Sequence, residues 1–158
     1  MTVMARNVLN DCHLALEMME LETDPHRLRV LWIGALALVR LVGEVLGKID
    51  AEAQPAMRSK IESHWRTLRN HKDPMFEKFI KGSRDRAVHS YDTDLIPIAT
   101  VDIFITGEGD VEHVQKLDEC LFSPMMGEFR SGEDSRDVFR DALNWWDNYL
   151  TQIEVEQY

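Results

Sequence analysis

The hydrophobic positions of this chain recur every three or four residues over several separate stretches, which is the spacing of amphipathic helices. Residues 3–22, 55–70 and 138–153 each carry such a stripe. The stripes comprise Met4, Val8, Cys12, Ala15, Leu16 and Met19; Met57, Ile61, Trp65 and Leu68; and Val138, Ala142, Trp145, Trp146, Tyr149 and Ile153. We therefore expect three helices over these ranges. Since Trp145 and Trp146 are adjacent, we expect one in the core and the other at a groove or a dimer contact.

Residues 26–50 form the most apolar segment, with an unbroken apolar run between Arg29 and Arg40. A bilayer-spanning helix needs about 20 such residues, and Arg40 and Glu44 interrupt this run. The pattern therefore predicts a buried central helix and no membrane span. Glycines recur along it, which would let a neighbouring helix or a second subunit approach closely. These glycines are Gly34, Gly43 and Gly47.

Stop and start signals separate the helices. Asp24-Pro25 and Asp73-Pro74 each combine an N-capping residue with a proline suited to a first helical turn. After Asp94 the pattern changes, because residues 95–105 are rich in branched side chains and a turn signal follows at 107–110. A hairpin with residues 111–115 and a short helix over 111–122 both fit what comes next. Residues 124–137 are polar and turn-rich.

Length and composition predict one soluble domain over residues 1–158. Charged residues make up 29% and hydrophobic residues 44%, which is typical of a folded soluble protein. The two cysteines, Cys12 and Cys120, have no metal-binding or redox spacing, and no export signal is recognisable, so we expect a cytoplasmic protein. His64 and His71 lack a third ligand nearby in sequence, and we interpret them as polar-face residues. No metal and no cofactor is expected.

The segment 80–94, IKGSRDRAVHSYDTD, gathers the chemically versatile side chains. On a helix, Asp85 and His89 lie at i and i+4, so the carboxylate could orient the imidazole and favour its protonated form. Arg84 and His89 diverge by roughly 140°. Two arrangements would bring them to one target: a helix break at Gly82-Ser83 that frees Arg84, or a two-fold dimer that supplies a second motif.

This segment resembles the signature of the HEPN superfamily, and more closely that of the HepT-like toxins, because Arg84 is followed after four residues by His89 and then by Tyr91. Ile80, Gly82, Asp85 and Val88 also match that pattern. The resemblance covers about a tenth of the chain. It implies a HEPN-like up-and-down bundle of four to five helices, here with a small irregular or β insertion near 95–135 that the compact HepT-like plan lacks.

The resemblance also implies a function, namely metal-independent cleavage of single-stranded RNA across a homodimer cleft, as in toxin or defence ribonucleases. Carried over by residue, His89 would be the general acid and base, Arg84 would neutralise the phosphorane-like charge, and Asp85 would orient them. Tyr91 would contact substrate or accept AMP from a nucleotidyltransferase-type antitoxin. We expect the neighbouring cations Arg86 and Lys81 to help bind substrate.

Charge is distributed unevenly along the chain. Its net charge is −10, but residues 58–89 carry nine Lys or Arg against four acids, a local excess of +5. Such a stripe suits phosphate capture, and it equally suits salt bridges to the acidic remainder. Two other functions stay open. The fold could be a non-catalytic dimer that binds protein or nucleotide through the same cleft, or an acidic antitoxin-like partner of a basic protein. The motif itself could be an ordinary solvated face with an i,i+4 ion pair.

Overall fold

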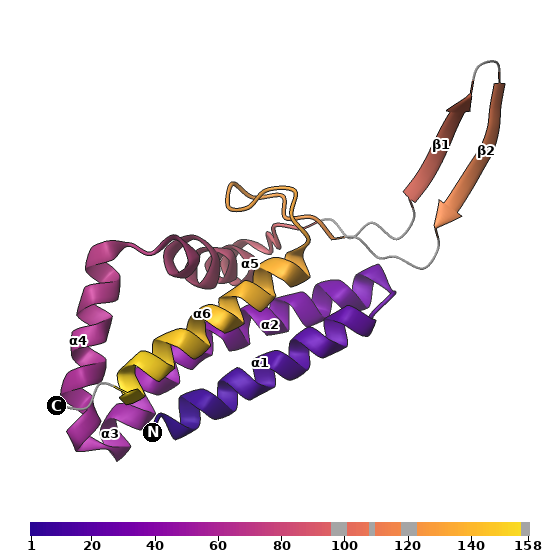
Figure 1. Ribbon diagram of the computed structural model, residues 1–158. Helices are drawn as coiled ribbons and strands as arrows, with labels where there is room; N and C mark the ends of the chain where they lie inside the picture. Colours follow the sequence, from indigo (N-terminus) through magenta and orange to yellow (C-terminus); the bar gives the residue numbers. More distant parts are fainter. Residues whose placement is uncertain (96–100, 108–109, 118–122, 156–158) are drawn as a thin grey trace.

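The apolar central segment forms the helix against which most of the other helices pack (Figure 1). The structure, a computed structural model, describes residues 1–95, 101–107, 110–117 and 123–155. Helix α2 (Pro25–Val45) continues through a π-helical turn, η1 (Leu46–Asp50), into α3 (Ala51–Ala53). It contacts α1 (Val3–Leu21), α6 (Ser135–Val155) and the helical segment that carries the motif. The fold is therefore mainly α-helical, as expected.

One face of α2 is buried in the core, where Trp32, Leu36, Val39 and Val42 have no exposed surface. The rod from Pro25 to Ala53 is also long and apolar enough to cross a membrane. However, 44% of its most apolar window is buried inside the fold, and core helices of soluble proteins pass the same test. Burial within a helical bundle is the simpler account of its apolar composition.

Both predicted Asp-Pro helix starts are formed. The Asp24 carboxylate accepts hydrogen bonds from the backbone N–H groups of His26 and Arg27 (2.8 and 2.9 Å). Asp73 precedes Pro74, and its carboxylate accepts the N–H of Phe76 (3.2 Å). Helix α4 (Pro55–His71), which packs against η1, α3 and α6, lies between these two starts in the sequence.

Acidic residues from other helices cap the start of α1. The buried Asp50 accepts the N–H groups of Met4 and Ala5 at 3.0 and 2.8 Å. Glu154 in α6 accepts the N–H and hydroxyl of Thr2. Burial of Glu154 opposes its ionisation, but hydrogen bonds from Arg6 and Thr2 outweigh that effect and lower its pKa to about 2. These contacts join the beginning of the bundle to its end.

The motif segment is one continuous helical rod with a change of hydrogen-bond pattern inside it. Residues Met75–Ser83 form a π-helix, η2, and Arg84–Ser90 form α5. Gly82 accommodates this, because a Cβ there would lie 3.0 Å from the carbonyl oxygen of Glu77. Gly82-Ser83 therefore does not break the helix before Arg84, and that expected arrangement is wrong. A π-helical stretch is uncommon and frequently accompanies functional sites.

The insertion after the motif consists of two different parts. Strands β1 (Val101–Gly107) and β2 (Asp110–Leu117) pair antiparallel, so the hairpin alternative is correct. The hairpin projects from the bundle and contacts no described helix (Figure 1). Residues 123–134, in contrast, lie on the bundle. There Met125 is 1% exposed, and Phe129 stacks on Phe79 of η2 with ring centroids 6.2 Å apart. Residues 118–122, which would end the alternative helix over 111–122 and which include Cys120, lie outside the described residues.

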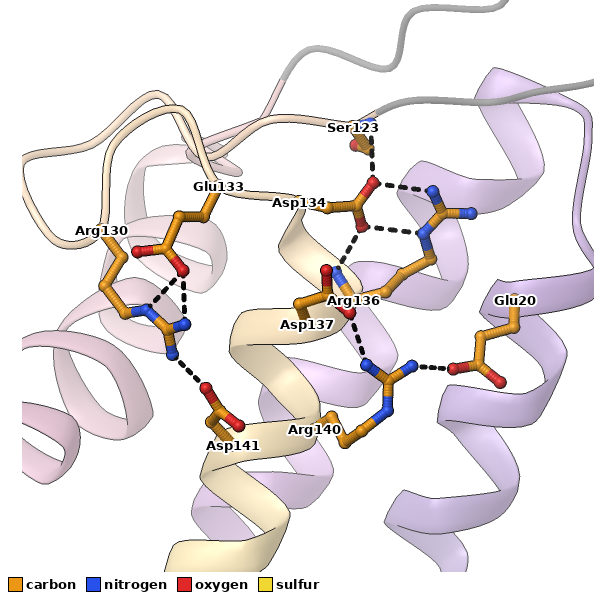
Figure 2. Close-up of polar contacts among 9 residues, drawn as sticks. All are labelled: Glu20, Ser123, Arg130, Glu133, Asp134, Arg136, Asp137, Arg140 and Asp141. Atoms are coloured by element: carbon orange, nitrogen blue, oxygen red, sulfur yellow. Dashed lines mark hydrogen bonds and ion pairs between the residues drawn. The ribbon is translucent and has the colours of Figure 1, made fainter.

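Charged side chains fasten this loop to the helices beneath it (Figure 2). Arg130 pairs with Glu133 and with Asp141 of α6, and Arg136 pairs with Asp134 at 2.7 Å. Arg140 of α6 reaches Glu20 of α1. The loop thus covers the end of the bundle next to the motif helix.

Candidate functional site

Helix α5 lies on α2, and this packing positions the motif. Near one end, Arg84 places Nη2 3.8 Å from Oε1 of Glu44. Near the other end, the Arg29 guanidinium lies 5.9 Å from the centre of the Tyr91 ring. Ala87 is buried between the helices at 3% exposure. The motif therefore runs along the surface of the central helix.

Arg84 lines a cleft of about 350 Å³ between the two helices. Its walls combine apolar side chains of α2, namely Ala37, Leu38 and Leu41, with Val88 of α5. The Arg84 guanidinium is half-buried and already has acidic partners. Nη1 donates to Asp85 Oδ1 at 2.7 Å, in addition to the longer ion pair with Glu44. A phosphate entering the cleft would compete with both carboxylates.

His89 is exposed to solvent. The expected hydrogen bond between Asp85 and His89 is not formed, since Asp85 accepts from Arg84 instead. Within the part of the chain that the structure describes, His89 has no hydrogen-bond partner. Arg84 faces α2 while His89 faces solvent, as their angular separation on a helix requires. One chain alone does not aim both groups at one phosphate.

Tyr91 ends α5 in a left-handed backbone conformation, with φ 55°. Its N–H and that of Asp92 both bond to the carbonyl of Arg86, which closes the helix. The side chain is 66% exposed. Tyr91 is therefore accessible to a ligand or a modifying enzyme, despite the insertion that follows it.

The two other predicted binding residues have internal partners. Arg86 pairs with the buried Asp94 and donates to the Ser83 hydroxyl at 3.2 Å, and the hydrogen bond to Asp94 raises its pKa. It fixes the chain that leaves α5 and so has a structural task. Lys81 makes an i,i+4 ion pair with Glu77 at 3.3 Å, but it also lines a pocket described next.

A second, larger pocket of about 570 Å³ adjoins the Arg84 cleft, because Arg40 and Glu44 line both. It lies between α2, α4 and η2, with Trp65 and Phe76 in its wall. Arg66 and Arg69, at i and i+3 on α4, also line it. Both cations belong to the basic stripe of residues 58–89, but nothing in the sequence indicates that they line a pocket, and Arg40 was expected only to interrupt an apolar run.

Trp145, Trp146 and Cys12 were also considered in the sequence, and the structure shows how far each is buried. Trp146 is fully buried while Trp145 is half-buried and lines another pocket, as expected for the pair. Burial raises the pKa of the Cys12 thiol to about 12, which makes it a poor nucleophile. Among the described residues, no three His, Cys, Asp or Glu side chains gather in a way that could hold a metal ion.

An exposed apolar stripe lies beside the motif. On α2 it comprises Val30 (68% exposed) and Leu41 (41%), with Gly34 and Ala37 between them on the same face. Val88 of α5, 52% exposed, extends it to the Arg84 cleft. Nothing in the chain lies within 4 Å of the position that a Cβ of Gly34 would take. A second subunit could therefore approach α2 closely at Gly34.

Searches against protein-family models, curated proteins and solved structures gave no match to this chain. The resemblance of the motif to the HEPN signature therefore stays a prediction from the sequence.

Proposed function

We propose that this protein is a HEPN-like, metal-independent endoribonuclease of toxin or defence type that acts as a homodimer on single-stranded RNA. The observation that carries the proposal is the setting of Arg84 and His89. One short helix holds a guanidinium in a cleft and an imidazole in solvent, directly beside an exposed apolar stripe. A second copy docked on that stripe would bring the complementary group of its own motif to the cleft.

The chemistry divides between these groups. His89 removes the proton from a ribose 2′-hydroxyl, whose oxygen then forms a bond to the adjacent phosphorus. The bond from phosphorus to the 5′-oxygen breaks, and a protonated imidazole supplies the proton that the leaving oxygen needs. Arg84 neutralises the charge on the phosphoryl oxygens. The products are a 2′,3′-cyclic phosphate and a free 5′-hydroxyl. Exposed Tyr91 contacts the RNA or accepts AMP from a nucleotidyltransferase-type antitoxin.

A binding module without catalysis is the alternative, and one observation favours it. Arg84 is already paired with Asp85 and lies near Glu44, so its charge is largely compensated inside the chain. The nuclease mechanism would also favour an Asp85 that orients His89, but Asp85 accepts a hydrogen bond from Arg84 and none from His89. In that case the same surface would hold a protein or nucleotide without cutting it.

RNA cleavage in EDTA by the purified protein separates the two functions. We expect the wild type to leave cyclic phosphate ends, and His89→Ala and Arg84→Ala each to lower the rate at least about 100-fold, the lower end of the usual contribution of a positioned acid or base. His13→Ala and Arg27→Ala are matched controls, because His13 is exposed on α1 and Arg27 is exposed at the opposite end of α2 from Glu44, the acid that Arg84 contacts. A folded dimer that binds RNA but does not cut it would establish the binding module instead.

A further inference from the structure

The pocket between α2, α4 and η2 is lined by both cations and carboxylates, but only the carboxylates all have ion-pair partners. Its three carboxylates are all paired: Glu62 with Arg58, Glu77 with Lys81, and Glu44 with Lys48 and Arg84. Arg40, Arg66 and Arg69, in contrast, make no ion pair with any described residue. Three guanidiniums without acidic partners therefore surround one hollow.

The neighbours of Arg40 explain why its guanidinium makes no ion pair with a described residue. Glu44 lies one helical turn beyond it and would be its natural i,i+4 partner. Glu44 is engaged by Lys48 at 3.5 Å and Arg84 at 3.8 Å, and the Arg40 guanidinium instead lies 5.6 Å from the centre of the Phe76 ring. This cation–π contact orients the guanidinium without neutralising it.

The wall of the pocket is aromatic and rigid. Trp65 and Phe76 meet edge to face with centroids 5.5 Å apart. The Trp65 ring lies directly on the backbone of α2, since a Cβ at Gly43 would lie 2.8 Å from its Cη2 atom. Phe76 is 4% exposed, whereas Trp65 is half-buried and so presents part of its ring to the pocket. Partly exposed aromatic rings beside cations suit the stacking of nucleic-acid bases.

We propose that this pocket binds one nucleotide, with its phosphate held by Arg66 and Arg69 and its base against Arg40 and Trp65. Guanidiniums bind phosphate through paired N–H donors. Three guanidiniums without an acidic partner among the described residues are more than a carboxylate ligand needs. The volume of about 570 Å³ lies within the usual range of about 300–1,000 Å³ for small-ligand pockets.

The source of that nucleotide follows from the position of the pocket. Because Arg40 and Glu44 also line the Arg84 cleft, a strand that places one phosphate at Arg84 continues into the pocket. We assign the nucleotide to a single-stranded RNA chain, next to the phosphate that is cut. This choice of source rests on the proposed nuclease function, whereas the pocket's affinity for nucleotides does not.

Calorimetric titration of the full chain with two probes tests the assignment. The first is a 2′-O-methyl tetranucleotide, which lacks the attacking hydroxyl and is not cut by the proposed chemistry, and the second is AMP. We expect the tetranucleotide to bind the double variant Arg66→Gln/Arg69→Gln at least about tenfold more weakly than it binds the wild type. The dependence of log affinity on log salt should also become shallower by roughly 0.7 for each phosphate that the double variant no longer neutralises.

Arg27→Gln is the matched control, because it removes an exposed cation of α2 at the end remote from α4 (Figure 1). It should change affinity less than about twofold. AMP that binds as tightly as the tetranucleotide, and is weakened equally by the double variant, would assign the pocket to a free nucleotide and overturn the choice of RNA. Binding of neither probe, or equal binding by wild type and the double variant, would overturn the proposal.

Failure of this inference is distinguishable from failure of the nuclease function. Cleavage that depends on His89 but is unchanged in rate and KM by Arg66→Gln/Arg69→Gln would refute the assignment of the pocket to the RNA strand and leave the nuclease function standing. Nucleotide binding that depends on Arg66 and Arg69, in a protein that does not cut RNA, would support the nucleotide-binding pocket and refute the nuclease function.

Discussion

At the scale of single residues, glycines in α2 decide how closely aromatic rings approach the central helix. A Cβ at Gly43 would lie 2.8 Å from Trp65 and 2.9 Å from Trp146, both at the Cη2 atom. Trp146 is fully buried and donates from its indole nitrogen to the carbonyl of Val39 at 2.8 Å, so it cannot move freely. The absence of one methyl group therefore shapes both the core and the wall of the basic pocket.

We expect Gly43→Ala to lower the free energy of unfolding by about 1–3 kcal/mol, because it overpacks a rigid site. Gly34→Ala, on the exposed face of the same helix, should instead raise the free energy of unfolding of the monomeric protein by up to about 1 kcal/mol, because alanine favours the helix and nothing in the same chain lies near its Cβ. Urea denaturation followed by tryptophan fluorescence measures both. Equal effects at the two positions would show that the contacts with the tryptophans do not govern stability.

The same scale explains why the chemistry of the motif was only partly predictable. The sequence offset placed Asp85 one turn before His89, but Asp85 instead bonds to the adjacent Arg84. Arg86 was predicted to help bind substrate, and in the structure it pairs with Asp94, eight residues further along the chain. Offsets along a helix indicate which groups can meet, but the choice among competing partners depends on tertiary packing.

At the scale of elements, periodicity and capping residues were informative where a segment was long. The helices expected over 3–22 and 55–70 are found at Val3–Leu21 and Pro55–His71. The π-helical pattern of Met75–Ser83 was not foreseen, because it differs from an α-helix in its hydrogen bonds and not in its apolar pattern. The insertion at 95–135 was predicted as one feature, but only its second part packs on the bundle.

This difference predicts two outcomes for the insertion. Replacing Val101–Leu117 with a short Gly-Ser linker should change the free energy of unfolding by less than about 0.5 kcal/mol, because the hairpin contacts no described helix. Met125→Ala should lower it by about 2–5 kcal/mol, because that side chain is 1% exposed in the core. Urea denaturation compares them.

The sequence also suggests that the insertion near 95–135 is a lid or a partner-binding element beside the site, and the hairpin replacement tests this role for the hairpin. Unchanged dimerisation, partner binding and RNA cleavage in the folded variant would refute that role. A loss of stability comparable to that of Met125→Ala would mean that the hairpin packs on the bundle after all.

At the scale of the whole molecule, basic and apolar side chains lie on different parts of the surface. The basic pocket and the motif share one region of α2, and the exposed apolar stripe of Val30, Ala37 and Leu41 adjoins it. A second exposed apolar set, Leu14, Met18 and Leu21, lies on α1. Only an interface on the first set would bring two motifs together, so the position of the interface tests the proposed function directly.

We expect Leu41→Glu to abolish dimer formation and RNA cleavage together while leaving the helical content intact. Leu41 is 41% exposed beside Arg84, so a buried charge there would be costly only in the dimer. Leu14→Glu is the matched control, because that leucine is 56% exposed on α1. Sedimentation velocity and circular dichroism measure both variants. A dimer that survives Leu41→Glu but not Leu14→Glu would place the interface on α1, away from the motif. The two Arg84 clefts would then lie apart, and cleavage across a shared cleft would be untenable.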